Sequence, residues 1–276
     1  MKHTLILLVL FQITFGAFAQ TDSSRVRNSS PYTTSFKVDG PVIAAGLGLT
    51  ALGLNMIQKK DPLTVAQVNA LSKNDVNKFD RFSAGYFSDQ ANDDSYLPFY
   101  GSFAMPVVAL LNRNIGRKAG QVMVLYLETM AITGSLYTLA AGAIVRHRPL
   151  VYSTAAPMAK RQSKNSQRSF FAGHTAATAA ATFFTAKVFN DFNPDSKARP
   201  FVWAAAAIVP ASVGYMRLKA GQHFLSDNLI GYGVGAAAGI LIPHLHKTKN
   251  GVTENLSIQP LMDGRHQGMA MTYTFK

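Results

Sequence analysis

The chain of 276 residues contains no cysteine, which excludes disulfide bonds and thiolate metal sites. Acidic residues are also scarce: Asp and Glu number 14 against 27 Lys and Arg, and the formal net charge is +13. This surplus of positive charge favours anionic partners such as phosphorylated substrates, anionic lipid surfaces or nucleic acid. With 48% apolar residues the chain can bury a sizeable core, and its length fits one main domain.

The first 19 residues have the layout of a secretory signal peptide, with a short basic start, an apolar stretch and small residues at Ala17 and Ala19. We expect cleavage after Ala19. An uncleaved anchor fits less well, because the apolar stretch is shorter than the ~20 residues that span a bilayer. Residues 20–38 are polar, rich in Ser and Thr and without periodicity, so they predict a flexible leader.

Six apolar segments follow, and each predicts a helix. They predict an all-α domain over residues 39–247, a six-helix bundle in which Ala and Gly allow close helix packing. The segments are Gly40–Gln58, Pro98–Asn112, Ala119–Val145, Ser169–Phe189, Pro200–Met216 and Asn228–Pro243. The polar region between the first two predicts short helices or a covering loop. Residues 254–276 combine an Asp-Gly turn signal with alternating apolar residues and predict a short β-hairpin.

The lengths of these segments leave membrane spanning open. The third segment carries one charge, Glu128, and is long enough to cross, whereas the second and sixth are marginal. Basic residues between the second and third segments would place that loop in the cytoplasm, yet a cleaved signal leaves the mature start outside, so the two expectations conflict. Glu128 is expected to make a buried polar contact between helices, and a functional role is the alternative. His244 and His246, after the last helix, are expected in solvent.

Three clusters of basic and histidine residues lie at ends of the last four predicted helices. Antiparallel helices with short connections bring alternate ends together, so the clusters are expected to meet on one face of the bundle. They are Arg146-His147-Arg148-Pro149, where a helix is expected to close before proline; SFFAGHT, residues 169–175, which opens the next helix; and RLKAGQHFLSD, residues 217–227, which joins the last two helices.

The residue types in these clusters suit a phosphate group. Arg148 and Arg217 offer forked donors that match phosphate oxygens, and helix starts add free N–H groups and partial positive charge. Two histidines, His174 and His223, can divide phosphoryl transfer: one attacks phosphorus and the other protonates the leaving oxygen. Asp227 lies one helical turn after His223 and is expected to accept the other ring N–H of that histidine.

The clusters RHRP, SFFAGHT and RLKAGQHFLSD resemble, in order, the three signatures of the type 2 phosphatidic acid phosphatase (PAP2) family. The superfamily also includes bacterial class A acid phosphatases and vanadium haloperoxidases. The family pattern is Lys, six residues, Arg-Pro; then Pro-Ser-Gly-His; then Ser-Arg, five residues, His, three residues, Asp. The third signature fits with both spacings intact, although Met216 replaces the serine. The resemblance covers roughly residues 80–246.

The resemblance implies a helical bundle that hydrolyses phosphate esters through a phosphohistidine, without metal or other cofactor. The nucleophile would be His223, and His174 would be the general acid and base. The residues it assigns are His223, His174 and Asp227 for catalysis, and Arg148, Arg217 and Gly173 for phosphate binding.

Two departures from the family pattern remove phosphate-holding side chains. Ala141 stands where the family has its lysine, and Ala172 replaces the serine before Gly173. On a continuous helix, position 141 lies two turns before Arg148 on nearly the same face, so a lysine there would reach the same phosphate.

Four functions remain open. Apolar helices and a basic rim favour a phosphatase acting on lipid phosphates; the signal peptide also fits a soluble periplasmic acid phosphatase acting on small esters. A vanadate-dependent haloperoxidase would need the absent lysine and serine, and those losses also fit a catalytically impaired phospholipid-binding relative. We expect an exported, membrane-associated protein of the cell envelope with its active site facing the periplasm, or alternatively a soluble periplasmic one. No nucleic-acid partner is expected, and the sequence gives no oligomeric state.

Overall fold

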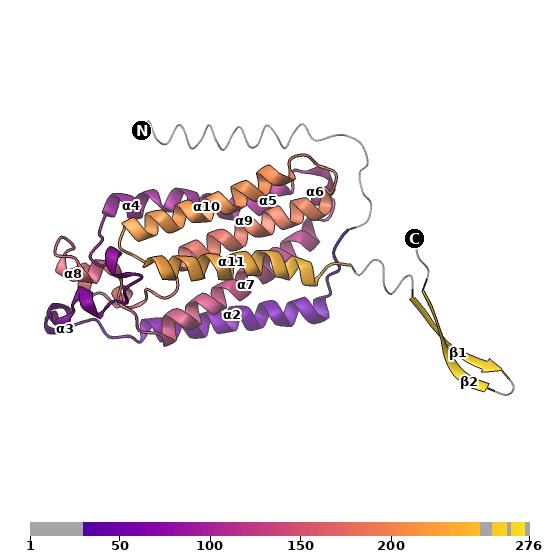
Figure 1. Ribbon diagram of the computed structural model, residues 1–276, viewed down its shortest axis with the longest axis horizontal. Coiled ribbons are helices and arrows are strands. Elements are labelled where there is room, and N and C mark those ends of the chain that lie inside the picture. Colours follow the sequence, from indigo (N-terminus) through magenta and orange to yellow (C-terminus); the bar gives the residue numbers. More distant parts are fainter. Residues whose placement is uncertain (1–29, 249–255, 264–265, 274–276) are drawn as a thin grey trace.

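The computed structural model describes residues 30–248, 256–263 and 266–273. The expected signal peptide and most of the expected leader lie outside these residues. The described domain is mostly helical, as expected, and six long helices run side by side along it (Figure 1). Each includes most of one predicted apolar segment. They are α2 (Phe36–Gln58), α5 (Tyr96–Ala109), α7 (Ala119–Ala143), α9 (Gly173–Phe192), α10 (Arg199–Lys219) and α11 (Leu225–Leu245).

Short helices complete the domain. The polar region between α2 and α5 contains two of them, as expected, together with 3₁₀ turns, whereas α6 and α8 were not foreseen. The short helices are α3 (Val65–Ala70), α4 (Asp89–Asp94), α6 (Arg113–Gly116) and α8 (Met158–Gln162). The 3₁₀ turns span Lys73–Asp75, Arg81–Ser83, Pro149–Tyr152 and Lys164–Gln167.

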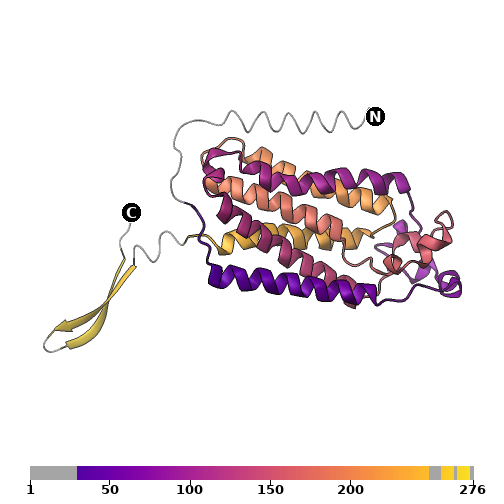
Figure 2. The same ribbon diagram turned by 180° about the vertical axis from the view of Figure 1, so that it is seen from behind.

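Helix α9 is the centre of the bundle and contacts α5, α7, α10 and α11 (Figure 2). Its sequence is dominated by Ala and Thr, and most of its residues are buried. Small side chains allow α11 to lie directly on it: a Cβ added at Gly235 would lie 2.0 Å from the Ala176 carbonyl oxygen. This close approach requires glycine, and it fixes the middle of α11 against the first turn of α9.

The outer surface of the bundle is strongly apolar. Large apolar side chains are exposed on α2, α5, α7, α10 and α11, among them Phe36, Leu47, Phe201, Ile208 and Leu241. Four helices, α2, α7, α10 and α11, are long and apolar enough to cross a membrane. An apolar exterior of this extent supports membrane association of the protein.

The last part of the expected leader is docked on the bundle. Tyr32 is buried, and its hydroxyl donates a hydrogen bond of 2.8 Å to Asp191 at the end of α9. The backbone N–H of Thr33 donates to the carbonyl of His246 at 2.8 Å. The prediction of a flexible segment is therefore wrong for residues 30–38, because an aromatic ring and a paired backbone hold them in place.

The end of the bundle where α2 begins contains His246 and Glu128, for which the sequence made predictions. His244 is exposed as expected, but His246 is half-buried and was wrongly expected in solvent. Its Nε2 atom lies 3.4 Å from Oε2 of Glu128, so Glu128 makes the expected polar contact between helices.

At the C-terminal end, β1 (Leu256–Asp263) pairs antiparallel with β2 (His266–Tyr273). The register runs from Leu256 opposite Tyr273 to Asp263 opposite His266. Gly264, in the expected turn, lies outside the described residues.

Candidate active site

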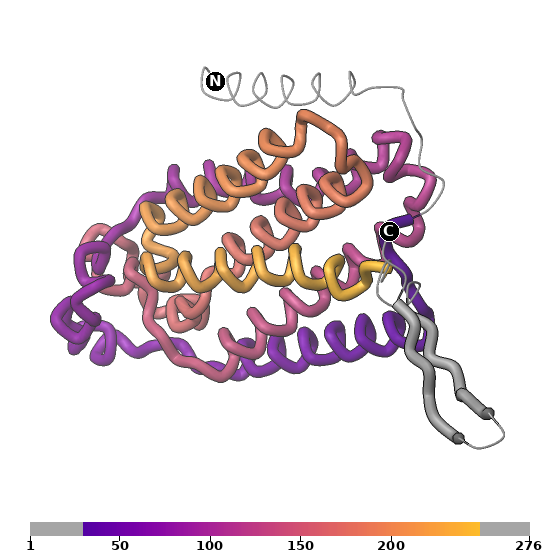
Figure 3. Tube along the Cα trace, turned by 45° about the vertical axis from the view of Figure 1, so that its right-hand side comes forward, coloured from indigo at the N-terminus to yellow at the C-terminus, as the bar shows by residue number. Residues whose placement is uncertain are grey.

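The expected meeting of the three clusters at one end of the bundle can be followed in Figure 3, where α7 and α10 end and α9 and α11 begin. Direct backbone bonds connect the clusters. The N–H of Ser169 donates to the carbonyl of Arg146 at 3.0 Å, and the N–H of Leu150 donates to the carbonyl of Gly221 at 3.0 Å. The first cluster is thereby joined to both of the others.

Helix α7 ends at Ala143, not at the residue before Pro149 as the sequence predicted. The following residues leave the helix because their backbone pairs with the chain just before the second cluster: the N–H of Arg146 donates to the Gln167 carbonyl at 3.1 Å. The freed carbonyls of Ala141 and Ile144 accept hydrogen bonds of 2.8 and 2.9 Å from Nζ of Lys60.

This early end of α7 corrects a further expectation. Arg148 follows four residues of non-helical chain, so positions 141 and 148 do not share a helix face. Ala141 is fully buried at the end of α7. A lysine side chain at position 141 is therefore not expected to reach a phosphate held by Arg148.

Helix α9 begins at Gly173 rather than at Ser169. A Cβ at Gly173 would lie 2.6 Å from the ring of Tyr137, so a larger residue here would require that ring to move. The loop before His223 also depends on glycine: Gly221 has φ of +69°, and a Cβ there would lie 1.8 Å from the Tyr86 carbonyl oxygen.

The imidazole of His223 is buried and points one nitrogen at the backbone of the second cluster. Its Nδ1 lies 2.6 Å from the carbonyl oxygen of Ser169. A carbonyl oxygen only accepts, so Nδ1 carries the ring proton and Nε2 keeps its lone pair. Burial, with the nearby charges of Arg148 and Arg217, lowers the pKa of His223 well below its usual value. The ring is therefore neutral at neutral pH.

Asp227 does not accept the His223 N–H, so the expected direct pair is wrong. Its carboxylate instead accepts hydrogen bonds from the Ser169 hydroxyl at 2.6 Å and the Phe224 N–H at 2.9 Å, and forms an ion pair with Arg146. Asp227 therefore holds the segment whose carbonyl orients His223, and it acts on the ring through Ser169.

Arg146 is part of the same support. Its guanidinium also contacts Asp80 at 2.7 Å and lies over the Phe224 ring, 4.8 Å from the centroid. Two carboxylates neutralise this arginine, so it is not a free phosphate ligand. The sequence did not reveal the pairing, because Asp80 is distant along the chain from both partners.

Three other arginines have no such neutralisation. The buried Nε atoms of Arg148, Arg168 and Arg217 have no hydrogen-bond acceptor among the described residues. No carboxylate in the described part of the chain forms an ion pair with any of the three. Their remaining bonds go to neutral groups: Arg148 donates to the Gln222 side chain, and Arg217 donates to Asn92 at 2.8 Å.

The three arginines all lie close enough to His174 to affect its pKa. Burial and then the charges of Arg217, Arg148 and Arg168 lower the pKa of His174 to about 3. Its ring packs on Phe99, with centroids 4.3 Å apart.

Arg168 was missed by the sequence reading, although it directly precedes the SFFAGHT cluster. A basic residue beside a phosphate motif was a usable signal.

The group of three arginines and two neutral histidines, of which Arg148, Arg217 and His223 are buried, lies beside helix starts and is of the kind suited to an oxyanion. Residues 122–251 match the family model of the PAP2 superfamily, the superfamily that the three motifs resemble.

One solved structure to which the chain is similar is described as the crystal structure of the first transmembrane PAP2 type phosphatidylglycerolphosphate phosphatase from Bacillus subtilis. The identity is 16%, the similarity covers 86% of this chain and 94% of that chain, and the TM-score is 0.36. No curated protein matches the chain.

Proposed function

We propose that the protein is a metal-independent phosphatase that hydrolyses phosphate esters through a phosphohistidine on His223. The match of residues 122–251 to the PAP2 superfamily model supports phosphatase activity. The observation that carries the proposal is the tautomer of His223: its Nδ1 proton is committed to the Ser169 carbonyl, which leaves the Nε2 lone pair for attack.

A phosphate ester bound between the arginines would offset the charges that lower the pKa of His174, so that His174 enters the reaction protonated. In the first step, Nε2 of His223 attacks phosphorus and the bond from phosphorus to the leaving oxygen breaks. The protonated His174 donates its proton to that oxygen, and the product alcohol departs. In the second step, water attacks the phosphohistidine, His174 takes a proton from the water, and inorganic phosphate leaves with His223 restored. Asp227, through Ser169, keeps the nucleophilic ring in position.

The phosphate would be held by Arg148, Arg217 and Arg168, with Gly173 at the helix start. Their unpaired Nε atoms support this role, since an oxyanion would satisfy donors that are otherwise buried without partners. Arg168 would supply the positive charge that the family lysine provides elsewhere, so the loss of that lysine at Ala141 need not abolish activity.

We propose lipid phosphates as the substrate class. The apolar side chains exposed around the bundle would hold the protein at a membrane, where a lipid phosphate presents its head group. We also propose that the protein is exported and that the site faces the periplasm. A soluble phosphatase acting on small esters is the alternative, and it predicts a mature protein that stays dissolved without detergent.

The test is phosphate release by the purified protein from a panel of lipid phosphates and from a chromogenic small ester. His223→Asn should abolish release on every substrate, while the control His244→Gln, in an exposed histidine, should retain it. Incubation with an ester labelled at phosphorus and quenching in alkali, in which phosphohistidine survives, should leave label on the wild type and on His244→Gln but not on His223→Asn. Substantial turnover by His223→Asn would refute the covalent mechanism; no turnover by the wild type on any substrate would favour an impaired lipid-binding relative.

A further inference from the structure

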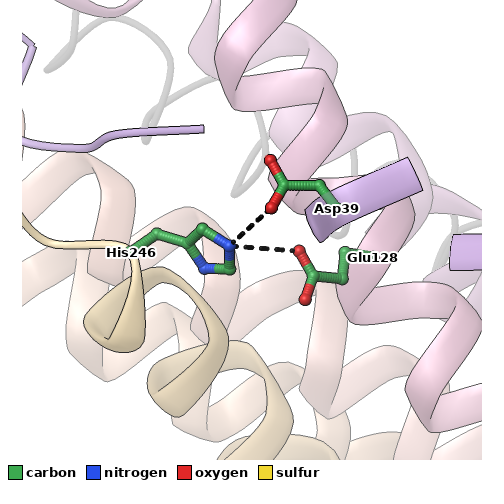
Figure 4. Close-up of side chains that lie close together, drawn as sticks. All are labelled: Asp39, Glu128 and His246. Atoms are coloured by element: carbon green, nitrogen blue, oxygen red, sulfur yellow. Dashed lines mark hydrogen bonds and ion pairs between the residues drawn. The ribbon is translucent and has the colours of Figure 1, made fainter. Parts of the chain in front are cut away.

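A second group of titratable side chains lies at the end of the bundle opposite the candidate active site. Asp39 in the first turn of α2, Glu128 in α7 and His246 after α11 turn toward one another (Figure 4). Nε2 of His246 lies 3.2 Å from Oδ1 of Asp39 and 3.4 Å from Oε2 of Glu128. The proposed phosphatase mechanism uses none of these residues.

Nε2 of His246 and Oδ1 of Asp39 are within hydrogen-bond distance, and the facing atoms of the group are also arranged as metal ligands. Nδ1 of His246 lies 2.8 Å from the Ile242 carbonyl oxygen, and since a carbonyl only accepts, Nδ1 carries a proton. A neutral ring would then aim its Nε2 lone pair at two carboxylates, an arrangement that requires a cation between them. Metal-binding histidines are commonly oriented in this way, by a bond from the other ring N–H to a backbone carbonyl.

The carboxylates support the same conclusion. The side chain of Glu128 is only 7% exposed, and its Oε2 atom, which points into the group, receives no hydrogen bond from the described residues. Asp39 is held by its other oxygen, Oδ2, which accepts the Ser35 N–H at 2.7 Å and leaves Oδ1 for the group. A buried carboxylate oxygen without a donor is costly unless a cation neutralises it.

The spacing suits one small divalent ion. Zinc binds imidazole nitrogen and carboxylate oxygen at about 2.0–2.2 Å, and tetrahedral geometry at that radius separates neighbouring ligands by ~3.4 Å. The observed separations of 3.2 and 3.4 Å from Nε2 agree with that value, and all three ligand atoms lie within 4.8 Å of one another. Two carboxylates and a neutral imidazole carry a charge that one divalent ion balances.

We propose that Asp39, Glu128 and His246 form a binding site for one divalent transition-metal ion, with Zn²⁺ as the representative ion. The ion would join the start of α2, the middle of α7 and the end of α11, elements far apart in the sequence. It would act as a structural ion, and a water molecule would complete its coordination on the side where His246 is partly exposed.

The competing state is a proton in place of the metal, so that a charged imidazole bridges both carboxylates. To separate the two, protein without a polyhistidine tag is stripped with a chelator and titrated calorimetrically with Zn²⁺. The wild type should bind one Zn²⁺ per chain at this site. Loss of a hydrogen bond to a metal ligand typically weakens metal binding by about 10–100-fold. Loss of a ligand itself, in Glu128→Gln or His246→Gln, should therefore weaken Zn²⁺ binding by at least about 100-fold. The matched control His244→Gln, at an exposed histidine two residues away, should bind as the wild type does.

A second measurement does not depend on how well the variants fold. Co²⁺ added to the stripped wild type should produce the visible absorption of a tetrahedral nitrogen and oxygen site, and Zn²⁺ should displace it. Phosphatase activity should change little in stripped protein, which separates this site from the proposed catalytic one. Equal Zn²⁺ binding by the wild type and Glu128→Gln, or no binding by either, would assign the group to a proton-bridged ion pair and overturn the proposal.

Discussion

Among the residues of the candidate site, the connection between Asp227 and His223 has the clearest consequence for mutagenesis. The carboxylate of Asp227 acts through the Ser169 hydroxyl, and the His223 ring bonds to the Ser169 carbonyl. In a direct pair, Ser169 would be dispensable. In the observed arrangement, the Ser169 hydroxyl connects the Asp227 carboxylate to the backbone segment that orients the His223 ring.

We therefore predict that Ser169→Ala lowers kcat by about tenfold, the effect of losing a hydrogen bond of ~1.4 kcal/mol that positions the nucleophile. Asp227→Asn should cost more, because it also weakens the ion pair with Arg146. Steady-state kinetics on a chromogenic phosphate ester measure both, and circular dichroism checks the fold. A Ser169→Ala enzyme with wild-type kcat would restore a direct role for Asp227.

Arg168 provides a second test of the site. If it holds phosphate, Arg168→Gln should lower kcat/KM by roughly 10–100-fold, the loss of one charged hydrogen bond of ~1.5–3 kcal/mol, and weaken inhibition by inorganic phosphate. The control Lys164→Gln removes an exposed positive charge four residues earlier and should change neither quantity. Unchanged phosphate inhibition in Arg168→Gln would mean that the arginine does not contact the anion.

The pKa of His174 predicts a dependence of stability on pH. Its folded value, about 3, lies below the usual value of 6.5, so between these pH values the unfolded chain binds the extra proton. This residue therefore lowers stability as pH falls from about 6.5 toward 3. The melting temperature should fall more steeply with acid in the wild type than in His174→Gln. Added inorganic phosphate should reduce the difference between the two proteins, because a bound anion offsets the arginine charges. An equal dependence of melting temperature on pH in the wild type and His174→Gln would mean that the pKa of His174 is not lowered.

The sequence was informative about the types of residue in the site and less so about their partners. Arg148, His174, Arg217 and His223 were found because each stands at the end of an apolar segment. The role of Asp227 was misjudged because helical spacing describes only neighbours on the same helix, and the Ser169 carbonyl comes from another segment.

At the scale of helices, the bundle rests on close packing between α9 and α11. These helices begin next to His174 and His223, so the separation of their axes sets the separation of the two histidines. A shift of about 1 Å can cost a catalytic site two orders of magnitude in rate.

We predict that Gly235→Ala lowers phosphatase activity by at least tenfold and lowers the melting temperature, since its Cβ would lie 2.0 Å from the Ala176 carbonyl oxygen and force the helices apart. Gly233→Ala is the matched control: it lies on the same helix, and nothing lies within 4 Å of its added Cβ. That variant should be as active as the wild type and at least as stable. Equal losses in both variants would mean that the contact at Gly235 is not their cause.

The long helices were predictable because each is an apolar run bounded by charged or Gly and Pro residues. Their ends were not. Helix α7 stops at Ala143 because the next residues pair with the chain near Ser169, and α9 starts at Gly173 because the residues before it are held by that pairing and by Asp227. Contacts of this kind depend on the packed bundle, which local sequence does not report.

For the molecule as a whole, the route of the chain constrains the orientation of the site. Helix α2 begins at the end opposite the candidate active site and ends beside it. If an exported N-terminus lies in the periplasm, a complete crossing by α2 would carry the site to the cytoplasmic side. Export and a periplasmic site therefore both hold only if the two ends of the bundle lie in the periplasm, with the apolar surface in contact with the membrane.

The absence of cysteine makes this joint proposal directly testable, because any introduced cysteine is the sole thiol. Lys164→Cys places an exposed thiol at the site end, and Lys197→Cys places one at the opposite end, between α9 and α10. A membrane-impermeant maleimide, applied to cells whose inner membrane is intact, should label both variants. Labelling of Lys197→Cys alone would mean that the bundle crosses the membrane with its site toward the cytoplasm. Labelling of Lys164→Cys alone would mean that the site faces the periplasm and the N-terminus is not exported, because the chain then enters α2 from the cytoplasmic side.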